Sequence, residues 1–154
     1  MVTNRQQRLY WDSCNFISLI SEDEVARADV CQHILEDAEN GSVEIVTSTL
    51  TIAEVIKPKG STILTLQQEE FISSFFLHEY ILTYDVTRAI AESARKLSRE
   101  HKLRPPDAIH LATALAAEVD IFQTWNTNDF KELDVPIRIQ VPTWIGTLRM
   151  PLEE

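Results

Sequence analysis

Short apolar runs alternate with longer segments of helical periodicity along this chain. The apolar runs predict strands at 9–12, 43–47, 80–84 and 121–124, with a short fifth strand at 136–141. Apolar residues spaced three and four apart predict helices at 22–39, 49–56, 65–77, 86–101 and from Pro105 onward. Strands that alternate with helices predict an α/β fold, in which a parallel sheet of four to five strands is flanked by helices.

Polar residues and prolines predict where several of these elements begin and end. The polar residues at 13–15 predict a turn directly after the first strand, and Asp85 predicts an N-cap for the helix at 86–101. Pro105 and Pro106 predict a helix start, because a proline in the first turn loses no hydrogen bond that the helix needs.

The helix that begins at Pro105 carries a carboxylate, Asp107, in its first turn. One of its faces is apolar and is formed by Ala108, Leu111, Ala112 and Leu115. This face predicts packing against a core, which places Asp107 near the positive end of the helix dipole. Taken alone, Asp107 is explained as an N-cap. Carboxylates at equivalent places elsewhere in the chain would argue for a shared function instead.

Three further carboxylates occupy such places. Asp12 ends the first strand, Asp129 lies just past the fourth, and Glu54 lies inside the helix after the second. In a parallel α/β sheet, functional groups gather where strands end and helices begin. Carboxylates brought together repel one another unless a cation is present, and oxygen ligands of this kind favour Mg²⁺ or Mn²⁺. Such a site suits hydrolysis at phosphorus.

The composition is that of an ordinary globular protein and excludes several other classes. The 154 residues are 44% hydrophobic and 25% charged, which predicts one domain over 1–154. No segment resembles a membrane span or a secretory signal, and two cysteines are too few for a disulfide framework or a cysteine zinc site. We therefore expect a cytoplasmic protein with no membrane partner.

The net charge of −10 argues against non-specific binding to nucleic acid, which depends on neutralising phosphates. Carboxylates that hold divalent cations would contribute to the same acidic excess, so the total charge does not separate the two cases. The chain has no glycine-rich phosphate loop, which excludes nucleotide binding of the P-loop or Rossmann kind.

Four segments, taken in order, resemble the PIN-domain nuclease family. They are Tyr10-Trp11-Asp12-Ser13 with Phe16-Ile17, Thr51-Ile52-Ala53-Glu54-Val55, the stretch from Leu103 to Ala114, and Thr124-Trp125-Asn126-Thr127-Asn128-Asp129-Phe130. The resemblance covers essentially the whole chain and implies an endoribonuclease that hydrolyses RNA phosphodiester bonds with Mg²⁺ or Mn²⁺. Many small members are VapC-like toxins held inactive by an antitoxin, and they are often dimers. The resemblance thus implies an RNA substrate, a possible cognate antitoxin and a homodimer.

The same motifs imply the residues of the site. Asp12, Glu54 and Asp107 match the three best-defined acids of the family. Many relatives place a fourth acid two residues after the strand-end threonine, where this chain has Asn126, and Asp129 follows three residues later. The resemblance implies that these three acids and Asp129 are catalytic and bind the metal, with Asn126 assisting. Whether Asn126 or Asp129 is the fourth site residue stays open.

The first motif contains one further auxiliary residue and one departure from the family pattern. Ser13 keeps the hydroxyl usually found beside the first acid, and the resemblance implies that it orients a metal or its water. Cys14 stands where many relatives have asparagine, and Asn15 follows it.

Other candidates have simpler explanations. We favour a half-buried, hydrogen-bonded structural role for His110 over a role as a partner of the site. Trp11 and Trp125 adjoin strand ends and are expected in the core, not stacked on bases. Basic residues near two of the acids either contact a phosphate backbone or form a solvated surface; they are Lys57, Lys59, Arg95, Lys96, Arg99, Lys102 and Arg104.

Two other functions compete with the ribonuclease. A catalytically weak PIN-fold binding module or scaffold is motivated by the imperfect fourth motif and by the acidic net charge. A Mg²⁺-dependent phosphatase on a similar sheet is disfavoured, because the chain lacks the Asp-x-Asp pair common in such enzymes.

Overall fold

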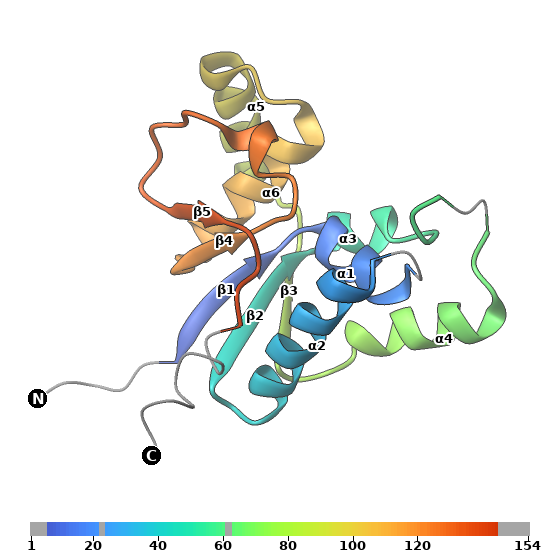
Figure 1. The fold of residues 1–154 in the computed structure, drawn as a ribbon. Helices are drawn as coiled ribbons and strands as arrows, with labels where there is room; N and C mark the ends of the chain where they lie inside the picture. Colours follow the sequence, from blue (N-terminus) through green and yellow to red (C-terminus); the bar gives the residue numbers. More distant parts are fainter. Residues whose placement is uncertain (1–5, 22–23, 61–62, 145–154) are drawn as a thin grey trace, which may run out of the picture.

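A computed structural model describes residues 6–21, 24–60 and 63–144 of the chain, and Figure 1 shows a sheet with helices on both faces. The strands are β1 (Gln7–Trp11), β2 (Val43–Ser48), β3 (Ile81–Tyr84), β4 (Ile121–Gln123) and β5 (Arg138–Gln140). The helices are α1 (Ser13–Ile20), α2 (Val25–Glu39), α3 (Thr49–Glu54), α4 (Leu66–Phe75), α5 (Arg88–His101) and α6 (Pro105–Ala116), with a 3₁₀ turn η1 (Thr127–Phe130).

All strand pairs are parallel, and the order across the sheet is β3-β2-β1-β4-β5. The predicted α/β architecture is therefore confirmed, including its fifth strand. The central strand β1 pairs on both sides, with Leu9 opposite Ile45 of β2 and opposite Ile121 of β4. The chain leaves β1 toward β2 on one side and returns to β4 on the other. This reversal places a topological switch point between the ends of β1 and β4.

Alternate residues of β1 enter two different cores, as the period of two in a strand requires. Leu9 and Trp11 pack under α1, α2 and α4, whereas Tyr10 packs under α5 and α6. Figure 1 shows these two helical layers on opposite faces of the sheet. Trp11 is fully buried, so its expected place in the core is confirmed. Because both faces are covered, the strands read as continuous apolar runs.

The segment directly after β1 differs from the prediction. Residues 13–15 were expected in a turn, but they open helix α1. Two polar side chains of this helix are buried and hydrogen-bonded: Asn15 donates to the carbonyl of Gln123 at 2.9 Å, and Ser18 donates to the carbonyl of Asn15 at 2.6 Å. Polar residues look like a turn in sequence, and only the adjoining strand β4 supplies the partner that allows Asn15 to be buried.

Two helix starts also differ from their predictions. Helix α5 begins at Arg88, and the hydroxyl of Thr87 accepts the backbone N–H of Ile90 at 3.2 Å, so the prediction that Asp85 is the cap was wrong. Helix α2 begins at Val25, and residues 22 and 23 of the predicted helix lie outside the described residues. Among the helices described, none is long and apolar enough to cross a membrane.

Candidate functional site

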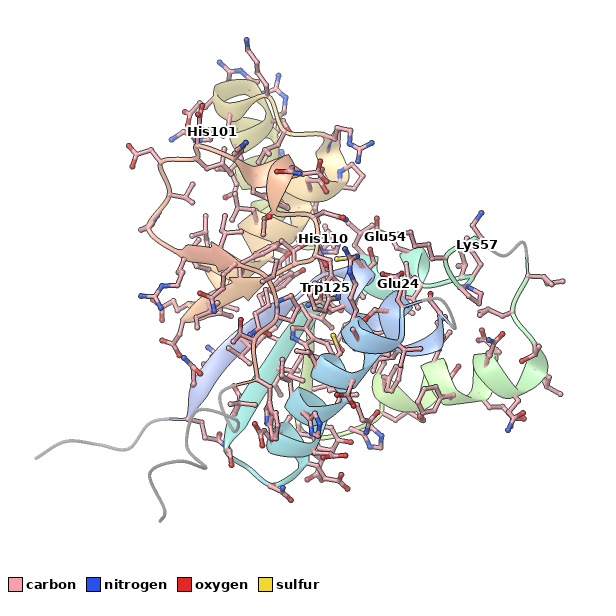
Figure 2. The ribbon with its side chains drawn as sticks, viewed as in Figure 1. Glu24, Glu54, Lys57, His101, His110 and Trp125 are labelled. Carbon is pink, nitrogen blue, oxygen red and sulfur yellow. The ribbon has the colours of Figure 1, made fainter. Side chains whose placement is uncertain are left out.

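The four acids named from the sequence lie on segments that follow the carboxyl ends of strands or open a helix beside them. Asp12 follows β1, and Glu54 is the last residue of α3, which begins directly after β2. Asp107 is the third residue of α6, and Asp129 lies in η1 after β4. The carboxyl ends of parallel strands meet at one edge of the sheet, and Figure 2 shows Glu54 at this edge beside His110.

Asp12 is buried at the switch point, where its side chain is 5% exposed in a polar pocket of its own. The Cys14 thiol donates to Oδ1 at 2.8 Å, and the Thr124 hydroxyl donates to Oδ2 at 2.8 Å. Burial raises the pKa of Asp12, while the charge of His110 and these two hydrogen bonds oppose that rise. Both carboxylate oxygens are thus oriented, one by Cys14 of α1 and the other by Thr124, the residue that follows β4.

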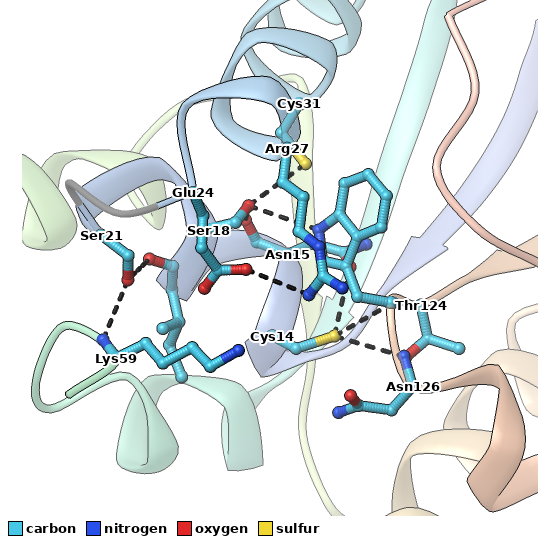
Figure 3. Close-up of polar contacts among 12 residues, drawn as sticks. Cys14, Asn15, Ser18, Ser21, Glu24, Arg27, Cys31, Lys59, Thr124 and Asn126 are labelled. Carbon is cyan, nitrogen blue, oxygen red and sulfur yellow. Dashed lines mark hydrogen bonds and ion pairs between the residues drawn. The ribbon is translucent and has the colours of Figure 1, made fainter.

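Cys14 bridges the first acid and the end of β4. Besides donating to Asp12, its sulfur accepts the backbone N–H of Trp125 at 3.3 Å (Figure 3). Burial and the charge of Asp12 raise the pKa of the thiol well above its ordinary value. The cysteine that replaces the usual asparagine of the family therefore acts here as a hydrogen-bonding thiol, and not as a thiolate.

Asp107 is not the N-cap of its helix, because Arg104 occupies that position and Pro105 is the first helical residue. Burial raises the pKa of Asp107, and the charges of Asp129 and Asp12 raise it further. The nearby guanidinium of Arg104, whose Nε lies 3.6 Å from Oδ2, opposes that rise. The structure therefore brings Asp129 and Asp12 within electrostatic range of Asp107.

Glu54 is held by a buried hydrogen-bond chain that the sequence did not reveal. His110 Nε2 lies 2.6 Å from Glu54 Oε1, and His110 Nδ1 lies 2.7 Å from the hydroxyl of Tyr10. Burial, and then the charges of Asp12 and Glu54, raise the pKa of Tyr10 well above its ordinary value. The Tyr10 hydroxyl can donate to Nδ1, and an N–H at Nε2 can then donate to Glu54 Oε1.

The expected structural role of His110 is confirmed in its hydrogen bonds, although the side chain is fully buried and not half-buried. His110 also contacts Glu54, a candidate catalytic acid. The sequence alone favoured a purely structural role over such a role as a partner of the site. One signal was present in the sequence: His110 follows Asp107 by three residues, so both lie near one face of α6.

The carboxylate oxygens of the four candidate acids are suitable ligands for a hard divalent cation. Carboxylate oxygens are the preferred ligands of Mg²⁺ and Mn²⁺, and a cation would relieve the repulsion that raises the pKa of Asp107. Within the described parts of the chain, no three His, Cys, Asp or Glu side chains already form a group that could hold a metal ion. The charges of neighbouring carboxylates therefore act on Asp107, although the described residues do not already form a group of three metal ligands.

The two auxiliary residues lie close to these acids along the chain. Ser13 is the first residue of α1 and is partly exposed. The backbone N–H of Asn126 donates to the Thr124 hydroxyl at 3.1 Å, and its carbonyl accepts the backbone N–H of Asp129 at 3.0 Å. Asn126 thus links the group that orients Asp12 to the turn that carries Asp129.

A pocket of about 440 Å³ adjoins Glu54 and is lined by both acidic and basic side chains. Glu54, Cys14 and Asn126 line it together with three cations, Arg27, Lys57 and Lys59. A larger cavity of about 650 Å³ lies between α2 and α4, and its described lining includes neither the acids of the site nor a lysine or arginine. The smaller pocket is therefore the one connected with the candidate chemistry.

The other basic residues and Trp125 take different places. Arg95, Lys96, Arg99 and Lys102 are exposed on or just after α5, as a solvated helix face would be. The Trp125 ring is partly buried against the core under α1 and α2, and it carries the guanidinium of Arg27 at 5.0 Å from its centroid. The prediction that Trp125 lies in the core is thus only partly confirmed.

Comparison with known proteins agrees with the architecture. A family model described as PIN domain matches residues 9–136. A toxin–antitoxin complex from Klebsiella pneumoniae contains a similar chain, with a TM-score of 0.61, 22% identity, and coverage of 89% of this chain and 98% of that chain. VapC20 from Mycobacterium tuberculosis, a sarcin-ricin loop cleaving toxin, is similar with a TM-score of 0.59, 15% identity, and coverage of 84% and 98%.

At these identities the structural likeness concerns the fold. No curated protein sequence matches the chain significantly. The family model, however, spans the chain from β1 past η1 and includes all four candidate acids. On that match, this chain belongs to the PIN domain family.

Proposed function

We propose that this protein is a metal-dependent endoribonuclease that hydrolyses RNA phosphodiester bonds as the toxin of a toxin–antitoxin pair. The observation that carries the proposal is the position of Asp107 near Asp129 and Asp12: burial raises the pKa of Asp107, and the charges of these two acids raise it further. Acids arranged to repel one another lower stability, so their convergence calls for a cation that neutralises them. Membership of the PIN domain family supports the same activity.

In this proposal Asp12, Asp107 and Asp129 hold Mg²⁺ or Mn²⁺ together with Glu54. The ion, when bound, would polarise the scissile phosphate and neutralise charge on its oxygens. Cys14 and Thr124 orient the two oxygens of Asp12.

His110 fixes Oε1 of Glu54, which leaves the other carboxylate oxygen to face the metal or the attacking water. Ser13 and Asn126 assist from the ends of β1 and β4.

The toxin assignment and the antitoxin partner are supported by two structural relatives, of which one is a toxin–antitoxin complex and the other an RNA-loop cleaving toxin. A homodimer remains a prediction from the family resemblance, and a cytoplasmic location remains a prediction from the sequence composition.

A second candidate function is a binding module that keeps the fold and cleaves RNA weakly or not at all. One observation favours it: the described residues hold no preassembled group of three metal-binding side chains. The pairing of Glu54 with His110 points the same way, because that contact occupies one oxygen of a proposed ligand.

Cleavage of single-stranded RNA in Mn²⁺ separates the two candidates. We expect cleavage by the wild type, its loss on chelation with EDTA, and its loss in Asp107→Asn. Glu70→Gln, which removes an exposed carboxylate on α4, is the matched control and should cleave normally. Circular dichroism checks that each variant is folded. A folded wild type that shows no metal-dependent cleavage would establish the binding module.

A further inference from the structure

Among the described residues that line the pocket of about 440 Å³ beside Glu54, cations outnumber carboxylates. It contains three cations, Arg27, Lys57 and Lys59, against the two carboxylates Glu24 and Glu54. The chain as a whole carries a formal charge of −10, so this concentration of cations is a local feature. Such a pocket attracts an anion to the edge of the candidate active site.

Arg27 is held in place from two sides. Its Nη1 donates to Glu24 Oε2 at 3.0 Å, and its guanidinium lies 5.0 Å from the centroid of the Trp125 ring (Figure 3). A guanidinium presents five N–H donors in a planar fork, and its stacking on an indole reduces the rotamer freedom that binding would otherwise remove. Arg27 is therefore preorganised for an oxyanion that offers two adjacent acceptor oxygens, such as phosphate.

The two lysines lie on the loop that follows Glu54. The backbone N–H of Lys59 donates to the Ser21 hydroxyl at 2.9 Å, which ties this loop to the end of α1. Figure 3 shows the Lys59 side chain running from the loop toward Cys14. Neither lysine side chain makes an ion pair with another residue that the structure describes. Their charges are thus available to a ligand.

We propose that this pocket binds the nucleotide next to the scissile phosphate of single-stranded RNA. Arg27, Lys57 and Lys59 contact its phosphate, and the apolar wall formed by Ile56 and Pro58 lies against its sugar or base. This inference rests on the proposed ribonuclease function, because Glu54 and Asn126, two of the proposed site residues, line the pocket. The candidate active site would then contact its RNA substrate through these cations as well as through its carboxylates.

The size of the pocket defines the form of RNA that it accepts. Its volume falls within the range of about 300–1,000 Å³ that holds small ligands. One unstacked nucleotide fits such a space, whereas a duplex is recognised across successive grooves over about 16 base pairs. We therefore expect the protein to bind a single-stranded loop or end in preference to a duplex.

The test measures binding separately from cleavage. All variants are made in the Asp107→Asn background, without divalent ions, and fluorescence anisotropy follows a labelled single-stranded RNA over a range of salt concentrations. Replacing Arg27, Lys57 and Lys59 together by alanine should lower affinity at least about tenfold, and should reduce the slope of log affinity against log salt by about 0.7 for each lost contact. Arg138→Ala, on the edge strand β5 and outside the pocket, is the control for the loss of a single cation and should change neither quantity.

A second variant separates charge from geometry. Arg27→Lys keeps the cation and should retain the salt slope while losing part of the affinity, because lysine lacks the paired donors. Thermal unfolding checks that the variants are folded.

Unchanged affinity and slope in the triple variant would overturn the proposal. So would equal binding of duplex and single-stranded RNA, or triple-variant effects confined to binding of an antitoxin peptide. Failure of the ribonuclease assignment looks different, because RNA binding would persist while the wild type with Mn²⁺ left the RNA intact.

Discussion

His110 Nε2 and Glu54 Oε1 lie 2.6 Å apart, joining the buried face of α6 to the last residue of α3. The histidine side chain is 3% exposed and that of the glutamate 29%, so the contact connects the core to the open side of the candidate site. Tyr10, from the central strand, completes the chain behind the histidine. A candidate catalytic acid is thereby positioned from the interior of the protein.

Replacing His110 by alanine should show how much its hydrogen bonds to Tyr10 and Glu54 contribute to the free energy of unfolding. The substitution leaves the buried Tyr10 hydroxyl and Glu54 without their partner, so the free energy of unfolding should fall by about 2–4 kcal/mol in urea denaturation. Tyr10→Phe, which removes one hydroxyl only, should cost about 1–2 kcal/mol. Because the residues share one network, the double variant should lose less than the sum of the two. Strict additivity would contradict the proposed coupling.

Replacing Asp107 by asparagine should stabilise the metal-free protein near neutral pH. Burial and the charges of Asp129 and Asp12 raise the pKa of Asp107 above its ordinary 3.8, so the folded state binds this proton more tightly than the unfolded state. Wild-type stability therefore declines as pH rises from about 4 through the raised pKa, while asparagine does not titrate. We expect the variant to be about 0.5–2 kcal/mol more stable at neutral pH.

Urea unfolding in EDTA at a series of pH values measures this difference. The difference between Asp107→Asn and wild type should shrink toward acidic pH, where both side chains are neutral. A difference that stays constant across the pH series would show that the acidic cluster is not its cause.

Mn²⁺ should raise the melting temperature of the wild type. An ion that binds only the folded state at about 100 times its dissociation constant adds about 2.7 kcal/mol, which corresponds to roughly 5–10 °C for a chain of this size. Asp12→Asn should remove most of the shift, whereas the exposed Glu70→Gln should retain it. Differential scanning fluorimetry with and without Mn²⁺ makes the comparison. An equal shift in both variants would indicate metal binding elsewhere.

The fourth site residue can be identified by exchanging acid and amide. Asp129 raises the pKa of Asp107 by its charge, so we expect Asp129→Asn to lower Mn²⁺-dependent cleavage at least about 100-fold. Asn126→Ala should cost less than about tenfold, since its backbone makes the contacts to Thr124 and Asp129. Adding Asn126→Asp to Asp129→Asn should restore part of the rate. The reverse ranking would assign the fourth role to Asn126.

The two cysteines should react slowly with thiol reagents in the folded protein. Burial raises the pKa of Cys31 to about 11, and burial with the charge of Asp12 raises that of Cys14 further. Because the thiolate is the reactive form, labelling with iodoacetamide at mildly alkaline pH should be at least about 100-fold slower than in urea. Mass spectrometry of the labelled peptides follows each site. Rapid labelling of Cys14 would contradict its hydrogen bond to Asp12.

The order of elements could be predicted from the sequence because it depends on local periodicity. Apolar runs, capping residues and the two prolines before Asp107 act over a few residues, so they are visible without tertiary contacts. The same locality explains the errors. Helix α1 contains the buried polar residue Asn15, whose partner Gln123 lies on β4, and Thr87 competes with Asp85 at a nearby capping position.

The sequence by itself determined that acidic residues follow strands and open helices in a parallel α/β protein, because each of these facts concerns neighbours along the chain. Only the tertiary structure decided which groups touch them. The hydrogen bonds of Asp12 to Thr124 and of Glu54 to His110 join residues separated by 112 and 56 positions. Such pairs have no fixed spacing in sequence. The pairing of β1 with β4 and the packing of α6 on the sheet bring their side chains together.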